Sequence, residues 1–310
     1  MRRIGFCVGG MLLLLAAGCQ PPDPGVFETP EGAVGALAAM VDRSDGERID
    51  DAQIEAIFGP GSADLFRSGD DEADREDVAR VRAMIESNVT FEDFDEQTKI
   101  ALLGDAAWPW PIPLTRVENG WRFDTEAGRE ELLNRRIGRN ELWTLAAMHE
   151  IVDAQREYRQ HGRDGKRRAY ARQFLSSEGN HDGLYWPADE IAGESPLGAL
   201  LADSEARSPS PQPFHGYLYR MLTRQGEHAP GGERDYLNDD GLMTGGFAVI
   251  AWPAKYGNSG VMTFITNRQG LVYQQDLGQQ TEETASAITA YDPDISWVPT
   301  PDRLPETDQL

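Results

Sequence analysis

The chain has 310 residues and a formal net charge of −23 at pH 7, from 29 Lys and Arg against 52 Asp and Glu. This charge repels nucleic acid and anionic lipid headgroups, so neither is expected as a partner. Both cysteines, Cys7 and Cys19, lie near the N terminus. We therefore expect no disulfide in the folded part, whose stability must come from burial of apolar side chains.

Residues 1–18 have the pattern of a secretory signal. Two arginines precede the apolar run from Met11 to Ala17, which is too short to span a bilayer. Small residues end this run directly before Cys19, and the arrangement resembles the cleavage site of bacterial lipoprotein signals. The resemblance implies acylation of the Cys19 thiol, which anchors the mature chain in a lipid bilayer. Gln20 stands where aspartate would favour retention at the inner membrane, so the resemblance implies the periplasmic face of the outer membrane.

A Pro-rich tether at 19–28 is expected to precede an N-terminal α+β domain at 29–124. Thr29 and Pro30 are a typical N-cap and first helical residue. Helical and then alternating spacing of apolar residues predicts helices followed by a small antiparallel sheet. The expected helices are 30–43, 49–58 and 74–87, and the expected strands are 89–94, 98–103, 112–117 and 120–123. This order resembles the cone-shaped folds of the nuclear-transport-factor-2-like or cystatin-like kind.

A second α+β domain is expected at 125–300, followed by a flexible tail at 301–310. Thr125 is expected to cap a helix-prone stretch that reaches about Gln160 with a break at Gly138. A buried stripe is predicted on its second half, at Leu142, Leu145, Ile151 or Val152, Ala154 and Tyr158. A short helix at 170–175 and strands at 216–223, 246–252, 260–267 and 271–275 should follow. A long helix packed on an antiparallel sheet is an α+β layer architecture.

Five segments of the chain have distinctive sequences. They are Trp108 to Pro113, Gly120 to Glu131, Arg136 to Glu141, Asp182 to Pro187 and Ala251 to Ile265. These segments resemble the bacterial lipoprotein family known as domain of unknown function 2950, over about Phe27 to Pro299. The resemblance implies a class of protein and an address in the cell, and it implies no reaction.

The C-terminal half also resembles the head domains of type IV pilins and pseudopilins. In both, a helix that ends in an Ala-Gln-x-x-Tyr pattern, here Ala154 to Tyr158, precedes a strand with alternating aromatic residues, here Gly216 to Arg220. The chain departs from pilins because it has no prepilin cleavage site and no apolar N-terminal helix. The likeness therefore concerns the fold of the head and does not imply incorporation into a filament.

The catalytic and metal-binding patterns in the chain are incomplete. His149 and Glu150 begin like the zinc-protease helix His-Glu-x-x-His, but Asp153 stands in place of the second histidine. The loop around Ser259 is similar to that around a serine nucleophile, yet neither His181 nor His215 is in a recognisable context to act as its base. We therefore expect no catalytic residue, no cofactor and no bound metal.

Aromatic side chains are the candidates for binding a partner. Trp108 and Trp110 alternate with prolines, which donate no hydrogen bond to a sheet, so we expect an edge or extended loop with one indole partly exposed. The full candidate set is Trp108, Trp110, Tyr185, Trp186, Tyr217, Trp252 and Tyr256. The alternative is that these large rings pack in the core.

The sequence thus predicts a two-domain outer-membrane lipoprotein that is a non-catalytic interaction or assembly factor of the cell envelope, with an envelope protein as its partner. One alternative is a ligand-binding protein with a pocket in the N-terminal domain, and another is a hydrolase. A deep pocket with convergent polar groups would favour ligand binding. A Ser-His pair or a cluster of metal ligands would favour hydrolysis.

Overall fold

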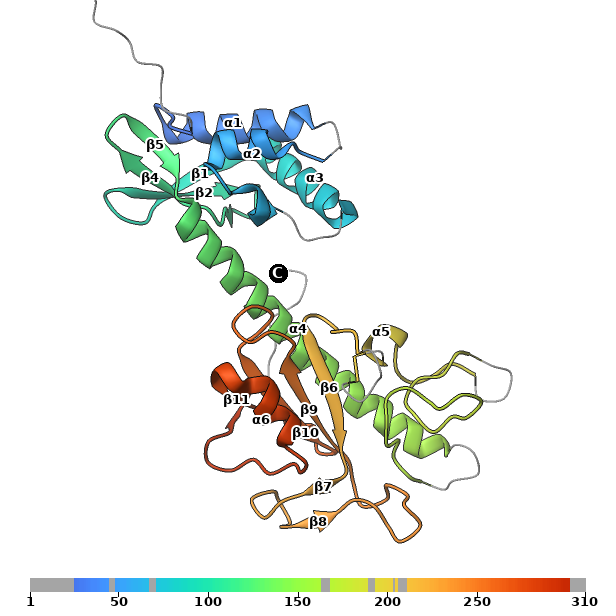
Figure 1. Cartoon of the computed structure of the whole chain (residues 1–310). Coiled ribbons are helices and arrows are strands. Elements are labelled where there is room, and N and C mark those ends of the chain that lie inside the picture. Colours follow the sequence, from blue (N-terminus) through green and yellow to red (C-terminus); the bar gives the residue numbers. More distant parts are fainter. Residues whose placement is uncertain are drawn as a thin grey trace, which may run out of the picture. The chain divides into compact units, whose positions relative to one another are not determined.

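The structure is a computed structural model that describes residues 25–44, 48–66, 71–162, 168–188, 193–202, 204–205 and 211–301. Cys19, residues 1–18 and the tail from 302 onward lie outside the described residues. The chain divides into two compact units, an N-terminal unit that ends at Glu131 and a C-terminal unit that begins at Leu132 (Figure 1). None of the helices in the described ranges has the length and hydropathy needed to cross a bilayer.

Three helices open the N-terminal unit. They are α1 (Pro30–Arg43), α2 (Asp51–Phe58) and α3 (Asp71–Ser87), with the 3-10 turn η1 (Ala63–Phe66) between the last two. The predicted cap of α1 is confirmed, because the Thr29 hydroxyl accepts a hydrogen bond of 3.1 Å from the Gly32 amide. Helix α2 begins later than predicted, because the Asp50 carboxylate accepts the amide of Ala52 and makes Asp50 the N-cap.

An antiparallel sheet completes the N-terminal unit. Its strands are β1 (Val89–Asp93), β2 (Thr98–Leu103), β3 (Trp108–Pro109), β4 (Leu114–Val117) and β5 (Gly120–Phe123). The order is β1-β2-β4-β5, and the two-residue strand β3 also pairs with β2. Leu37 of α1, Leu103 of β2 and Phe123 of β5 belong to one buried apolar cluster. The helices and the sheet therefore share the core of this unit.

Helix α4 (Thr125–His161) contains the boundary between the units and is continuous through Gly138, so the predicted break is wrong. A Cβ atom at Gly138 would meet nothing within 4 Å, and one glycine lowers helix stability by only about 1 kcal/mol. The predicted cap is also corrected. Asp124 accepts the amide of Ala127 at 3.1 Å, whereas the Thr125 hydroxyl donates to the carbonyl of Phe58.

The C-terminal unit contains a second antiparallel sheet, in the order β12-β11-β10-β9-β6. Its strands are β6 (Tyr217–Leu222), β9 (Ala248–Pro253), β10 (Met262–Asn267), β11 (Tyr273–Asp276) and β12 (Val298–Pro299). Leu145, Met148 and Ile151 of α4 lie in the same buried cluster as Val249 of β9 and Phe264 of β10. The predicted antiparallel pairing of β9 with β10 and the packing of the long helix on this sheet are confirmed.

A second helix, α6 (Thr281–Ala287), covers the other face of this sheet (Figure 1). Adjacent strand residues point to opposite faces. The Tyr219 hydroxyl lies 3.4 Å from the Thr144 hydroxyl of α4, whereas Arg220 donates to the carbonyls of Ala285 and Ser286 of α6. Both faces are therefore covered, which explains why every residue of β9 is buried.

The segment at 170–175 forms no helix, which corrects the prediction. The amide of Ala171 donates to the side chain of Gln155, and the Gln155 amide group donates back to the Ala171 carbonyl. The amide of Phe174 donates to the carboxylate of Glu205. Side chains from other segments thus form hydrogen bonds with backbone groups that would pair with one another in a helix. The unit also contains the short elements α5 (Ala199–Ala202), β7 (Arg224–Gln225), β8 (Arg234–Asp235) and the 3-10 turn η2 (Gly278–Gln280).

Candidate functional site

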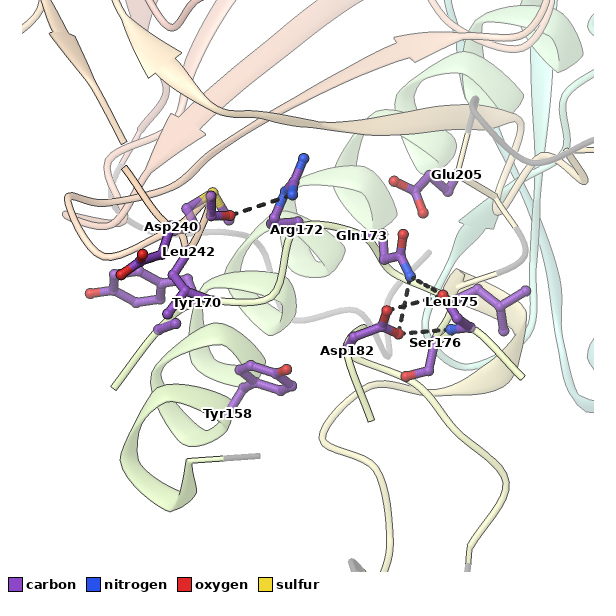
Figure 2. A pocket seen from close by; sticks show the side chains of 14 residues that line it. Tyr158, Tyr170, Arg172, Gln173, Leu175, Ser176, Asp182, Glu205, Asp240 and Leu242 are labelled. Atoms are coloured by element: carbon purple, nitrogen blue, oxygen red, sulfur yellow. Dashed lines mark hydrogen bonds between the residues drawn. The ribbon is translucent and has the colours of Figure 1, made fainter. Parts of the chain in front are cut away.

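A cavity of about 540 Å³ lies in the C-terminal unit (Figure 2). Three parts of the chain line it: the last turns of α4, the loop at 169–182 and the turn at 240–243, together with Glu205. Its apolar lining includes Tyr158, Tyr170, Leu175, Leu242 and Met243, and its charged lining consists of Arg172, Asp182, Glu205 and Asp240. We call this the C-terminal cavity.

Hydrogen bonds hold the loop that forms one wall of the C-terminal cavity. Asp182 accepts from the amide and the hydroxyl of Ser177 at 2.8 and 3.0 Å and from the side chain of Gln173 at 3.2 Å (Figure 2). Gly183 lies so close to the other arm of the loop that a Cβ atom there would be 2.6 Å from the nitrogen of Ser176. The Asp182-Gly183 pair therefore sets the shape of this wall.

The opposite wall is a turn stabilised by Asn238. Its side-chain oxygen accepts from the amides of Asp240 and Leu242, at 3.2 and 2.8 Å. Gly241 between them has φ +72°, a conformation that favours glycine. The amide of Tyr170 donates to the carbonyl of Met243 at 2.8 Å, which joins this turn to the loop on the first wall. The two walls are thus fixed to each other by backbone contacts.

The charged groups of the cavity have different surroundings. The carboxylates of Asp182 and Glu205 accept hydrogen bonds from the loop, so both serve to hold the wall. Arg172 donates to the carbonyl of Gly241 at 3.4 Å, which is longer than a good hydrogen bond. Asp240 is exposed at the edge of the turn. Among the described residues, Arg172 and Asp240 form no ion pair with one another or with a third group.

Four of the seven aromatic candidates for partner binding are buried, namely Trp110, Trp186, Tyr217 and Trp252. The Trp186 indole donates to the carbonyl of Gly193 and the Tyr217 hydroxyl to that of Met262. Burial is the main cause that raises the pKa of Tyr217 above its usual range. These four side chains build the core, where a partner cannot reach them without a change of fold.

The other three candidates, Trp108, Tyr185 and Tyr256, are partly exposed. Trp108 meets Trp110 edge to face, with 6.3 Å between ring centroids. The Tyr256 hydroxyl donates to a carboxylate oxygen of Asp276 at 3.2 Å, and this bond raises the pKa of Tyr256. None of the seven lines the C-terminal cavity. Sequence reasoning missed the cavity, although Asp182 begins one of the distinctive segments.

Ser259, in the loop that is similar to that around a serine nucleophile, has a structural role. The Ser259 hydroxyl accepts from the amide of Lys255 at 3.0 Å and lies 3.2 Å from the carbonyl of the same residue. The His215 ring instead stacks on Trp143, with centroids 4.6 Å apart, and burial lowers the pKa of His215. His149 is exposed on α4. Within the described ranges, no three His, Cys, Asp or Glu side chains are grouped to hold a metal ion.

The N-terminal unit has a smaller groove of about 210 Å³. Val34, Gly35 and Ala38 of α1 form one side, and Ile85 of α3 is among the residues on the other. Val89, Phe91 and Glu31 complete its lining. We call this the N-terminal groove. Its single charged side chain makes it a mainly apolar surface.

The two units define an α+β protein with a helix-covered antiparallel sheet and a cavity beside it. The chain belongs to the family described as Protein of unknown function (DUF2950), whose model matches residues 25–300. The family resemblance seen in the sequence is thereby confirmed. A search of curated proteins and a search of solved structures each found no match to this chain.

Proposed function

We propose that this chain is a lipid-anchored, non-catalytic binding protein of the bacterial cell envelope, and that the C-terminal cavity is its recognition site. The cavity carries the proposal. Its volume of about 540 Å³ falls within the range of about 300–1,000 Å³ that is usual for ligand pockets. Two tyrosine rings and other apolar side chains line it together with polar and charged groups, and a combination of apolar surface and placed polar groups is what fixes the orientation of a ligand.

The fixed walls of the cavity support this proposal. Gln155 holds Ala171 by two hydrogen bonds, and Asp182 accepts three from Ser177 and Gln173. A site with fixed walls binds with less loss of conformational entropy, because fewer side chains must be ordered by the ligand. The arrangement therefore favours recognition of a compound over a purely structural role for the loop.

The non-catalytic part of the proposal is supported by the surroundings of Ser259. A serine nucleophile needs a base within hydrogen-bond reach of its hydroxyl. Among the described residues, the Ser259 hydroxyl forms two hydrogen bonds, both with the backbone of Lys255. A structural role in the turn accounts for the serine, so we do not propose a hydrolase.

The proposed location in the cell envelope rests on the sequence. The apolar run before Cys19 and the small residues that end it support a lipid anchor. Gln20 supports the outer membrane with the folded units facing the periplasm, where an envelope protein or an envelope-derived compound would be the partner. The packing of α4 on the C-terminal sheet supports an analogy with pilin heads at the level of architecture only.

The N-terminal groove is the second candidate site, because its apolar lining suits a ligand pocket in the N-terminal unit. It is smaller than the C-terminal cavity and has one charged side chain, Glu31. It therefore offers fewer polar groups to orient a ligand. One experiment separates the two sites.

The test is equilibrium dialysis of purified residues 20–310 against the low-molecular-mass fraction of an envelope digest, with enriched compounds identified by mass spectrometry. Leu175→Arg places a bulky charge at the C-terminal cavity, where Leu175 is 42% exposed. Gly35→Arg blocks the N-terminal groove at a helical glycine with no neighbour within 4 Å of its Cβ position. A compound lost with Leu175→Arg and kept with Gly35→Arg supports the proposal. Enrichment that survives Leu175→Arg, or no enrichment at all, contradicts it.

A further inference from the structure

We propose that the C-terminal cavity takes a small dipolar ligand, a free amino acid or a dipeptide, whose carboxylate binds Arg172 and whose ammonium group binds Asp240. This inference rests on the function proposed above and adds the chemical class of the ligand. Three features carry it: the donors of Arg172, the position of Asp240 and the apolar surface of the cavity.

Arg172 has donors to offer a carboxylate. A guanidinium has about five N–H donors in a planar fork, and the described residues use one of them, in the 3.4 Å contact with Gly241. The planar guanidinium of an arginine matches the two oxygens of a carboxylate better than the ammonium group of a lysine does. Arg172 comes from the loop at 169–182 and approaches the cavity from that wall (Figure 2).

Asp240 offers the opposite charge from the other wall. Its amide is held by the side chain of Asn238, so the backbone position of Asp240 is fixed. The neighbouring residue Gly241 is the one whose carbonyl Arg172 contacts. The cation and the anion thus line the same cavity, yet they do not pair with each other within the described part of the chain. We expect a ligand with both charges to reach both groups, because Arg172 contacts the carbonyl of the residue next to Asp240.

The carboxylates of Asp182 and Glu205 are less available than that of Asp240 to bind the ammonium group of the ligand. Asp182 accepts three hydrogen bonds from the loop, and Glu205 accepts the amide of Phe174 and is 5% exposed. They fix the wall and add negative charge to the lining of the cavity. This charge disfavours a ligand that carries only a negative charge.

Apolar side chains that line the cavity favour a ligand with an apolar side chain. Tyr170 and Leu242 line the cavity near Asp240, and Leu175, which is 42% exposed, lines it beside Ser176 on the opposite wall (Figure 2). Covering an exposed leucine with an apolar group is favourable, because apolar surface leaves water. We therefore expect an amino acid or dipeptide with an apolar side chain to bind better than glycine.

The experiment follows the methyl NMR signals of Met243 and Leu242, which line the cavity, in residues 20–310 with labelled methyl groups. The probes are leucine, leucyl-leucine, N-acetyl-leucine and leucinamide. Leucine and leucyl-leucine should shift these signals in a saturable way. The two blocked compounds each lack one charge and should bind at least about tenfold more weakly, since a charge-assisted contact is lost.

Matched variants assign the two charges. Arg172→Gln and Asp240→Asn should each weaken leucine binding at least about tenfold. The controls Arg122→Gln, in the N-terminal unit, and Asp239→Asn, beside Asp240 but outside the lining, should leave it unchanged.

Two results would overturn the inference. One is an equal shift of the signals with blocked and unblocked compounds, and the other is no shift with leucine and leucyl-leucine. If the dialysis experiment still enriches a compound that is lost with Leu175→Arg, the proposed function stands and only its dipolar ligand is wrong. If the dialysis also enriches nothing, both proposals fail.

Discussion

The side-chain amide of Asn140 donates a hydrogen bond of 2.9 Å to the carbonyl of Ser259, 119 residues further along the chain. The next residue, Glu141, accepts the amides of Val261 and Met262, each at 2.9 Å. Two of the distinctive sequence segments therefore meet in the C-terminal unit. A Cβ atom at Gly216 would lie 2.8 Å from both Asn140 and Ser259, so this contact also requires a glycine there.

We predict that Asn140→Ala lowers the free energy of unfolding by about 1–3 kcal/mol, because the partly buried carbonyl of Ser259 loses its donor. Asn134→Ala, at an exposed position of the same helix, should change it by less than about 0.5 kcal/mol. Urea denaturation of the two variants is the measurement. Equal effects of the two substitutions would show that the contact with Ser259 does not stabilise the unit.

The glycine at position 260 should not tolerate a side chain. A Cβ atom there would lie 2.1 Å from the Tyr217 hydroxyl oxygen, and that ring is buried. We predict that Gly260→Ala destabilises the C-terminal unit by about 2 kcal/mol or more, because the ring cannot move without strain in the core. Gly35→Ala in α1, with no neighbour within 4 Å, should instead stabilise its helix by about 1 kcal/mol. Thermal unfolding of each variant tests the contrast.

We expect His228 to make a pH-dependent contribution to the stability of the folded protein. Its ring nitrogen Nδ1 lies 3.0 Å from Asp292, and this hydrogen bond is the main cause that raises the pKa of His228 above 6.5. A raised pKa in the folded state means that the stabilisation is complete below about pH 6.5 and is lost as pH rises through the folded-state pKa. The melting temperature of His228→Gln should therefore fall below that of the wild type in mild acid and approach it in alkali. A difference that is constant with pH would contradict this.

We predict that Cys19→Ser releases the protein from the membrane. The anchor at this position would be acyl chains on the cysteine, and no helix in the described ranges is suited to span a bilayer. Fractionation of cells that produce the variant is the measurement, with Cys7→Ser as the matched control. If Cys19→Ser stayed in the outer membrane after a salt wash, the anchor would lie elsewhere.

We expect purified residues 20–310 to show no hydrolysis of ester, peptide or glycan substrates. Ser259→Ala should reduce stability by about 1 kcal/mol, because the turn loses its hydrogen bonds to Lys255. A serine nucleophile would behave differently, since its removal would abolish turnover and leave stability almost unchanged. Loss of a measurable turnover in Ser259→Ala or His215→Gln, with the fold intact, would show that the protein is an enzyme.

Local signals in the sequence were sufficient for some of the regular elements, although α6 was not predicted and the predicted helix at 170–175 does not form. Helix α1 has the predicted bounds, because the Thr29 cap and the spacing of its apolar residues act within a few positions of each other. The strands β2 and β5 also have their predicted bounds. The family resemblance depended on such short segments as well, and the family model confirms it.

The tertiary structure alone decided where the aromatic rings lie and where the cavity forms. Whether Trp252 or Tyr217 is buried depends on α4 and α6, which cover the two faces of their sheet and lie far from them in the sequence. The loop at 169–182 has no regular structure, because Gln155 and Glu205 supply its backbone hydrogen bonds from two distant segments. Sequence periodicity reports only neighbours along the chain, so it could not place Arg172 and Asp240 on the walls of one cavity.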